Sequence, residues 1–192
     1  MKTKRIFAYI IDFFIINFLS TLIFKVAFNN SAYENYEDKV TAYYKELASS
    51  GSTDYTEEDL MKIIYNIQKD QIPLSIIQFG LTVLYFGIIS FMTNGLTIGK
   101  KILKIRVVPV EGKKLNPGLY FLREIILTNS IIDLLSIINI SLCGVEKWYL
   151  LNSIITNLGT LTTLILLGFM IFREDERSLH DIICKTKVIE EK

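Results

Sequence analysis

Four long apolar segments constrain the fold of this chain more than any other feature. They cover residues 6–28, 72–92, 119–142 and 151–172, and each has the roughly 20 residues that a helix needs to cross about 30 Å of hydrocarbon. With 51% hydrophobic residues and a net charge of +1, the 192-residue chain is too apolar for an ordinary soluble domain and has no basic excess for nucleic acid. The sequence predicts an all-α membrane protein with four transmembrane helices in the lipid bilayer.

The charges of the connecting segments predict how these helices are oriented. Lys and Arg gather before the first helix, between the second and third, and after the fourth, whereas residues 29–71 are acidic. Because basic residues accumulate on the cytoplasmic side, we expect both termini and residues 95–118 to be cytoplasmic in a multi-pass protein of the cell membrane. Cys143 and Cys184 then fall on opposite faces, which leaves no disulfide and no C-x-x-C site.

The amino-terminal segment predicts a retained helix rather than a signal peptide. Its apolar run is longer than the core of a signal peptide, and no A-x-A-like cleavage site ends it. The whole of residues 1–192 therefore forms one membrane domain, with residues 29–71 as an acidic extracytoplasmic insertion within it.

The insertion has the apolar spacing of two amphipathic helices. The residues at three- and four-residue steps are Tyr33, Tyr36, Val40, Tyr43, Tyr44 and Leu47, followed by Leu60, Ile63, Ile64 and Ile67. Residues 49–54 interrupt the pattern, and Thr56 with Asp59 predicts a capping box for the second helix. Two interpretations stay open, namely helices packed together or lying on the outer membrane surface, and a tyrosine-rich docking face for an extracytoplasmic partner.

The predicted cytoplasmic segment contains a glycine-rich motif made of Gly95, Thr97, Gly99 and Lys100. A Walker A phosphate loop needs a glycine where Asn94 stands and a Ser or Thr where Lys101 stands, so the motif does not predict a nucleotide site. Residues 105–110 and 186–189 are rich in β-branched side chains and predict a small cytoplasmic β-ribbon.

Charged residues inside the apolar segments are the candidate functional groups. An acid such as Asp12 in a transmembrane helix costs roughly 2.5–3.5 kcal/mol or more, which makes it a functional-site hypothesis, although a buried structural ion pair is the alternative. Arg123 enters the third segment from the same side and could reach Asp12, while Asn129 and Asp133 lie four residues apart on one helix face. If Arg123 pairs with Asp12, Asp133 is the better proton carrier; the sequence leaves both arrangements open.

Four motifs in this order resemble the RDD family of bacterial membrane proteins. They are KRIFAYIID in the first helix, NGLTIGKKILKIRVV after the second, LRE at residues 122–124 and SLHDIICKTKVI near the C-terminus. The resemblance implies that Arg5, Asp12 and Asp181 are the charged residues that name the family. It also implies solute transport and, for some members, cation/proton exchange. The acidic insertion and the fourth helix go beyond the family's minimal arrangement.

The remaining constellation, His180 beside Asp181, does not predict catalysis. The chain has no second His, no H-E-x-x-H and no G-x-S-x-G, so we expect no enzyme, no metal and no cofactor, with Asp181 capping a helix or pairing near Lys100 or Arg106. Arg5 and Asp181 are also expected at the same membrane face, so a C-terminal segment that folds back under the bundle would bring them into contact. The sequence favours a small transporter or transporter subunit that moves a monovalent cation or proton and acts as a homo-oligomer or within a membrane complex. The alternative is a non-catalytic scaffold or accessory subunit.

Overall fold

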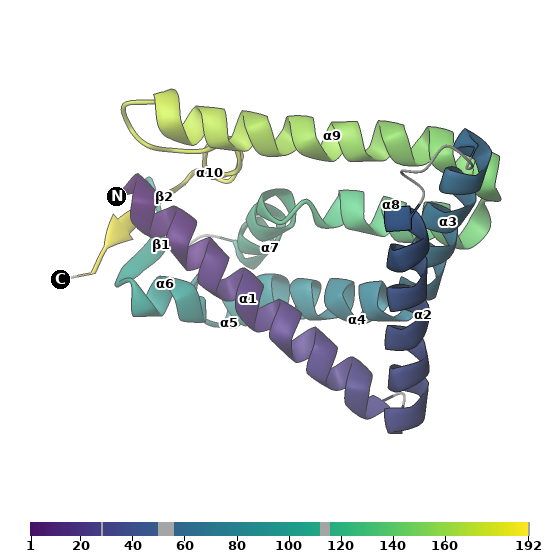
Figure 1. Ribbon diagram of the computed structural model, residues 1–192. Coiled ribbons are helices and arrows are strands. Elements are labelled where there is room, and N and C mark those ends of the chain that lie inside the picture. The colour runs from purple at the N-terminus through teal and green to yellow at the C-terminus, as the bar shows by residue number, and fades with distance from the viewer. Residues whose placement is uncertain (28, 50–55, 112–115, 192) are drawn as a thin grey trace.

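The computed structural model describes residues 1–27, 29–49, 56–111 and 116–191. Within these residues, three helical segments are long and apolar enough to span a membrane. They are α1 (Lys2–Ala27), the continuous run of α4 (Ile72–Thr82), η1 (Val83–Ile89) and α5 (Ser90–Met92), and α9 (Val145–Phe172). Figure 1 shows α4 and α9 running alongside one another at a distance, with α1 crossing in front.

The third predicted membrane helix is not one helix, which corrects the sequence prediction. It consists of α7 (Pro117–Leu127) and α8 (Ser130–Leu142), which are bent by 63° relative to each other. Asn129 adopts a left-handed backbone conformation with φ 54° at the break, and asparagine tolerates this region better than most residues. The described residues therefore contain three unbroken candidate spans, and a fourth if the bent pair crosses as one unit.

The insertion folds as the two predicted helices, α2 (Asn29–Ser49) and α3 (Glu57–Asp70). The predicted capping box is confirmed, because the Thr56 hydroxyl accepts from the Asp59 N–H and the Asp59 carboxylate accepts from the Thr56 N–H. Tyr65 of α3 packs with Ile140 and Trp148, so α3 is attached to the turn between α8 and α9. Residues 50–54 of the predicted break and the side chains of Tyr33, Tyr36 and Leu47 lie outside the described part of the chain.

The small β-ribbon is also confirmed. Strands β1 (Ile105–Pro109) and β2 (Thr186–Glu190) pair antiparallel, with Val107 opposite Val188. Their inner side chains form an apolar core with Ala8 of α1 and Tyr120 of α7. Two short helices, α6 (Ile98–Ile102) and α10 (Leu179–Ile183), flank the ribbon.

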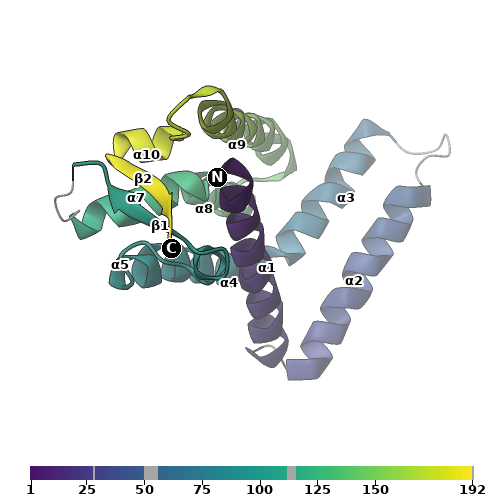
Figure 2. The same ribbon diagram turned by 90° about the vertical axis from the view of Figure 1, so that its left-hand side faces the viewer.

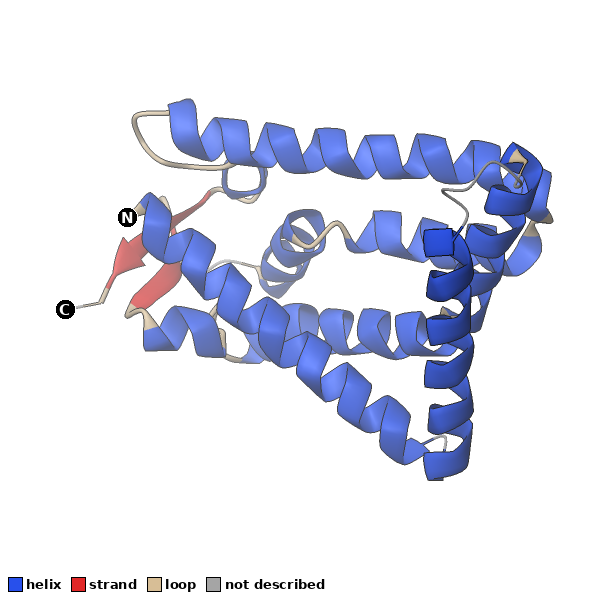
Figure 3. Cartoon of the chain, in the orientation of Figure 1, coloured by secondary structure: helices blue, strands red, loops and turns tan. Residues whose placement is uncertain are grey.

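Both chain ends lie on the same side of the helical bundle, beside the ribbon. Figures 1 and 3 show the two strands and the N-terminus together at one end, and Figure 2 looks onto that end. The insertion helices lie at the opposite end (Figure 1). We call the side with the ribbon the terminal end and residues 173–191 the tail.

Candidate functional site

Asp12 is buried at the contact between α1, η1 and α6, where neutral donors surround its carboxylate. The Tyr85 hydroxyl and the Gly99 N–H donate to Oδ1 at 2.6 and 2.7 Å, and the Thr97 hydroxyl donates to Oδ2 at 2.5 Å. Tyr85 is fixed in turn, because the Ile98 N–H donates to its oxygen at 2.8 Å. The wide π-helical turns of η1 present Tyr85 to this site, as such turns often do at functional positions.

The glycine-rich motif after α5 is the segment that encloses Asp12. A Cβ at Gly99 would lie 2.2 Å from the carbonyl oxygen of Ala8, so only glycine allows α6 to approach α1 this closely. Gly95 has φ +85°, a conformation that glycine adopts readily. Thr97 caps α6 and also binds Asp12. The glycine-rich motif, which was compared above with a Walker A loop, therefore binds the buried carboxylate of Asp12.

A second group of buried charges joins the tail to the bundle. It comprises Arg5, Lys100, Arg123, Glu124 and Asp181, which we call the charge cluster. Arg123 donates to Asp181 Oδ1 at 2.9 Å and also pairs with Glu124, whose Oε1 accepts from Lys100 Nζ at 2.9 Å. Arg5 donates to Asp181 Oδ2 and to the backbone carbonyl of Glu176. These contacts link α1, α6, α7 and α10.

The contact between Arg5 and Asp181 joins the first and the last of the three charged residues that the sequence motifs singled out, the other being Asp12. The sequence prediction that Asp181 caps a helix is confirmed, because its carboxylate and Ser178 form the capping box of α10. The predicted pairing near Lys100 or Arg106 is wrong: its partners are Arg5 and Arg123, while Arg106 lies beside Glu191. The tail folds back under the bundle, and this confirms the contact between Arg5 and Asp181 that their shared membrane face suggested.

Burial and neighbouring charges shift the pKa values of Asp181 and His180 in the tail. Burial alone would raise the pKa of Asp181, but the positive charges of Arg123 and Arg5 outweigh it and hold that pKa below its usual range. Burial lowers the pKa of His180 to about 3, and the charge of Arg123 acts in the same direction. At neutral pH Asp181 is ionised and His180 is neutral.

A direct pair between Asp12 and Arg123, one of the two arrangements that the sequence left open, is not formed. The Asp12 oxygens accept from Tyr85, Thr97 and Gly99, while the guanidinium of Arg123 is engaged by Glu124 and Asp181. Of the predicted set, Asp12, Arg123 and Asn129 line one cavity without bonding to one another, whereas Asp133 lines a different cavity.

Asn129 holds the break between α7 and α8 against α9. Its side-chain amide donates to Thr163 Oγ1 at 2.8 Å and to the Gly159 carbonyl at 3.3 Å. On the other side of the break, the Thr128 hydroxyl donates to the Glu124 carbonyl. These bonds pair the polar side chains of Asn129 and Thr128 at the break, which would be costly to leave unpaired in an apolar environment.

Asp133 lies one turn beyond the break and lines a separate cavity. This Asp133 cavity has a volume of about 200 Å³, and its polar lining groups are Tyr9, Ser75, Gln78, Thr82, Thr128, Asp133 and Ser136. No described residue donates a hydrogen bond to the Asp133 carboxylate or forms an ion pair with it. Asp133 is also exposed on the surface of the single chain.

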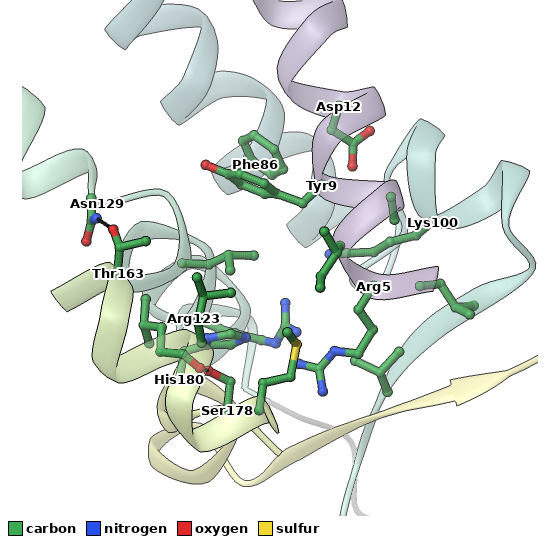
Figure 4. Close-up of a pocket in the computed structure, with 18 residues that line it drawn as sticks. Arg5, Tyr9, Asp12, Phe86, Lys100, Arg123, Asn129, Thr163, Ser178 and His180 are labelled. Atoms are coloured by element: carbon green, nitrogen blue, oxygen red, sulfur yellow. Dashed lines mark hydrogen bonds between the residues drawn. The ribbon is translucent and has the colours of Figure 1, made fainter. Parts of the chain in front are cut away.

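A further cavity lies at the terminal end, between α1 and α9. This terminal cavity has a volume of about 170 Å³. Figure 4 shows the head groups of Arg5, Lys100 and Arg123 pointing into one space, with His180 and Ser178 nearby. Tyr9 and Phe86 line both cavities, and their stacked rings, with centroids 6.1 Å apart, lie between the charge cluster and the Asp133 cavity.

Sequence reasoning missed Tyr85 and Glu124 as parts of the site. A tyrosine in an apolar run is also common in membrane helices, so nothing in the pattern distinguished Tyr85. The adjacent charges Arg123 and Glu124 in an apolar segment were a usable signal, because a buried charge of each sign calls for compensation. Among the described residues, no three His, Cys, Asp or Glu side chains gather as a ligand set for a metal ion.

Comparison with known proteins agrees with the motifs. The chain is 28% identical over 120 residues to the uncharacterized protein YxaI of Bacillus subtilis (strain 168). The aligned region covers 62% of this chain and 58% of that relative. No solved structure matches the chain. The sequence profile of the RDD family matches residues 2–185, which include Arg5, Asp12 and Asp181 as well as the helices that hold them. With its apolar helices, the chain is a membrane protein that belongs to the RDD family.

Proposed function

We propose that the protein is a small transporter, or a subunit of one, that binds a monovalent cation or proton at Asp133. The observation that carries this proposal is an unpaired carboxylate in a polar cavity beside a broken membrane helix. Discontinuous helices with unwound backbone mark substrate and ion sites in many secondary transporters. Ionisable groups in such positions also serve as proton relays.

The other membrane carboxylates are less suited to ion exchange. Asp12 accepts three hydrogen bonds from neutral donors, and Glu124 pairs with Lys100 and Arg123. A bound ion or proton would have to displace these partners. Asp133 has no such competition among the described residues, and the neighbouring Thr128, Ser136 and Gln78 supply neutral oxygen atoms.

The exposure of Asp133 supports an oligomer as the working form. A carboxylate that faces lipid costs several kcal/mol, so the protein needs water, an ion or a second subunit beside it. A second copy packed against α8 would cover the open side of the cavity and extend the polar path beyond one small bundle. We therefore propose a homo-oligomer or a larger membrane complex.

The alternative function is a non-catalytic scaffold or accessory subunit. It is favoured by the charge cluster, in which each of the five residues forms an ion pair with another member and so stabilises the arrangement of α1, α6, α7 and α10. Neither function includes a catalysed reaction.

Proton flux in vesicles that contain the purified protein tests the transport proposal. We expect flux that depends on Na⁺, K⁺ or Li⁺ and that is lost in Asp133→Asn. Glu146→Gln, which changes an exposed carboxylate at the start of α9, is the matched control and should keep wild-type flux. Wild-type protein without flux under all three cations contradicts transport and supports the scaffold.

A further inference from the structure

The terminal cavity opens sideways toward the region that lipid occupies. Its walls include Ile6 of α1 and Leu167 of α9, which are also exposed on the outer surface at 38% and 39%. Leu166 and Met170, deeper in the same wall, are each only 6% exposed. The cavity is therefore reached between α1 and α9, where the hydrocarbon chains of a bilayer would lie.

Three cationic side chains, each also paired with a buried carboxylate, line this cavity at its terminal end. Arg5, Lys100 and Arg123 line it, whereas Asp12 is the one carboxylate among its described lining residues. Both oxygens of Asp12 are already occupied by other donors. The balancing carboxylates of Glu124 and Asp181 are fully buried and are not part of the cavity wall. An anion in the cavity would thus meet the cations first.

His180 supplies a second, independent indication of a ligand. Its side chain is buried and lines the cavity, yet neither ring nitrogen has a hydrogen-bond partner among the described residues. Nε2 lies 3.5 Å from Asp181 Oδ1 without a hydrogen bond. Buried polar atoms are nearly always paired, so an unpaired imidazole beside a cavity indicates a polar group that binds there.

The dimensions of the cavity and the position of its charged groups at one end fit one end of a lipid. Thr163, which also lines the cavity, lies nine residues before the end of α9, or roughly 14 Å along the helix. The charged groups lie at the terminal end, and the deeper part has the apolar side chains Leu127 and Phe86 together with Asn129 and Thr163, which are hydrogen-bonded to each other. A cavity of roughly 150 Å³ can hold a benzene-sized group in another protein, so about 170 Å³ accommodates a head group or a short stretch of acyl chain.

We propose that the terminal cavity binds the phosphate head group of an anionic membrane lipid, which enters between α1 and α9. The phosphate contacts Arg5, Lys100 and Arg123, and a head-group hydroxyl or phosphate oxygen pairs with His180. The first part of one acyl chain follows the apolar wall of α9. Cationic pockets between membrane helices recognise anionic lipids in this way. This inference does not depend on transport at Asp133.

Native mass spectrometry of the delipidated whole chain, with thermal unfolding in parallel, tests the proposal. The probes are phosphatidylglycerol, phosphatidylcholine with the same acyl chains, and inorganic phosphate. We expect phosphatidylglycerol to bind at least about tenfold more tightly than phosphatidylcholine, because charge-assisted hydrogen bonds distinguish them. Equal binding of the two lipids overturns the proposal. The same thermal shift with inorganic phosphate alone overturns the lipid as the occupant and indicates a soluble anion.

Two variants locate the binding without disturbing the charge cluster. Leu167→Trp should obstruct the opening and lower phosphatidylglycerol affinity, whereas Leu164→Trp, at a 61% exposed position of the same helix outside the cavity, should not. His180→Leu should lower that affinity about tenfold while the lipid-free protein keeps or gains thermal stability, since no described residue bonds to the ring. Wild-type affinity in Leu167→Trp and His180→Leu places the lipid elsewhere and refutes the proposal.

Discussion

The charge cluster at the terminal end and the cavity around Asp133 are two opposite solutions to the same problem, a charge in an apolar bundle. In the cluster, Arg123 lies between Glu124 and Asp181, and the carboxylates are fully buried. Asp133 has a cavity with neutral polar groups and no charged partner among the described residues. Removing one member of a buried ion pair is costly, because the other charge is left without a partner. A carboxylate that has no ion-pair partner can instead gain or lose a proton or an ion with little cost to the stability of the fold. The proposed function therefore gives exchange to Asp133 and a structural role to Glu124 and Asp181.

The largest expected effect is on the free energy of unfolding, which should differ between a variant in the charge cluster and a variant at Asp133. Arg123→Gln leaves Glu124 and Asp181 without their shared cation and should lower the free energy of unfolding by about 3–5 kcal/mol. Asp133→Asn should lower it by no more than about 0.5 kcal/mol, because no described residue loses a partner. Reversible unfolding in mixed detergent micelles measures both values. If the two variants lose similar stability, the division between the regions is wrong.

The attachment of the tail to the bundle should weaken when Asp181 is replaced and when the pH is lowered. Because Arg123 and Arg5 hold the pKa of Asp181 low against burial, the ionised carboxylate stabilises the fold above its ordinary pKa of about 4, and this contribution is lost as the pH falls through the lowered value. Asp181→Asn should remove about 1.5–3 kcal/mol of tail stability already at pH 7. Hydrogen exchange of residues 179–190, corrected for the intrinsic rate, should rise more than tenfold.

Asp175→Asn is the matched control for this measurement. Asp175 pairs with Arg173 and Arg177 on the surface of the same tail, and exposed pairs contribute little. Unchanged exchange in Asp181→Asn, or an equal rise in both variants, would show that the buried contact does not hold the tail.

The close approach of α6 to α1 should depend on a single glycine. Gly99→Ala would place a Cβ against the Ala8 carbonyl and the Asp12 carboxylate, and overpacking of this kind costs about 1–3 kcal/mol. Gly168→Ala has no atom within 4 Å of the added Cβ and should be neutral or stabilising. Thermal unfolding of the two variants makes the comparison. Equal melting temperatures would mean that α6 does not need this contact.

The smallest expected effect is the coupling energy between Asp12 and Arg123, a member of the charge cluster. Since Asp12 and Arg123 have different partners, a double-mutant cycle of Asp12→Asn and Arg123→Gln should give a coupling energy below about 0.5 kcal/mol. The cycle of Arg123→Gln with Asp181→Asn, in direct contact, should exceed that value. Strong coupling in the first cycle would restore a shared site for Asp12 and Arg123.

The helices and strands were more predictable from the sequence than the contacts between them. Apolar length and periodicity are local properties, which is why the spans, the insertion helices and the ribbon were predictable. The break at Asn129 depends on one residue's backbone conformation and on bonds to Thr163, which is 34 residues away. The contact between Asp181 and Arg5, 176 residues apart, was expected from their shared membrane face. The additional partners, Arg123 for Asp181 and the Glu176 carbonyl for Arg5, were not predicted, because they depend on how α7 and the tail pack together.

Modification by a hydrophobic carbodiimide tests the central claim most directly, because the reagent enters from the lipid and reacts with membrane carboxyl groups that take up a proton. Peptide mapping by mass spectrometry after treatment of the protein in vesicles identifies the modified positions. The assignment of exchange to Asp133 predicts modification at Asp133, reduced by the transported cation, and none at Asp12 or Glu124. Modification at Asp12 or Glu124 with Asp133 untouched would contradict it.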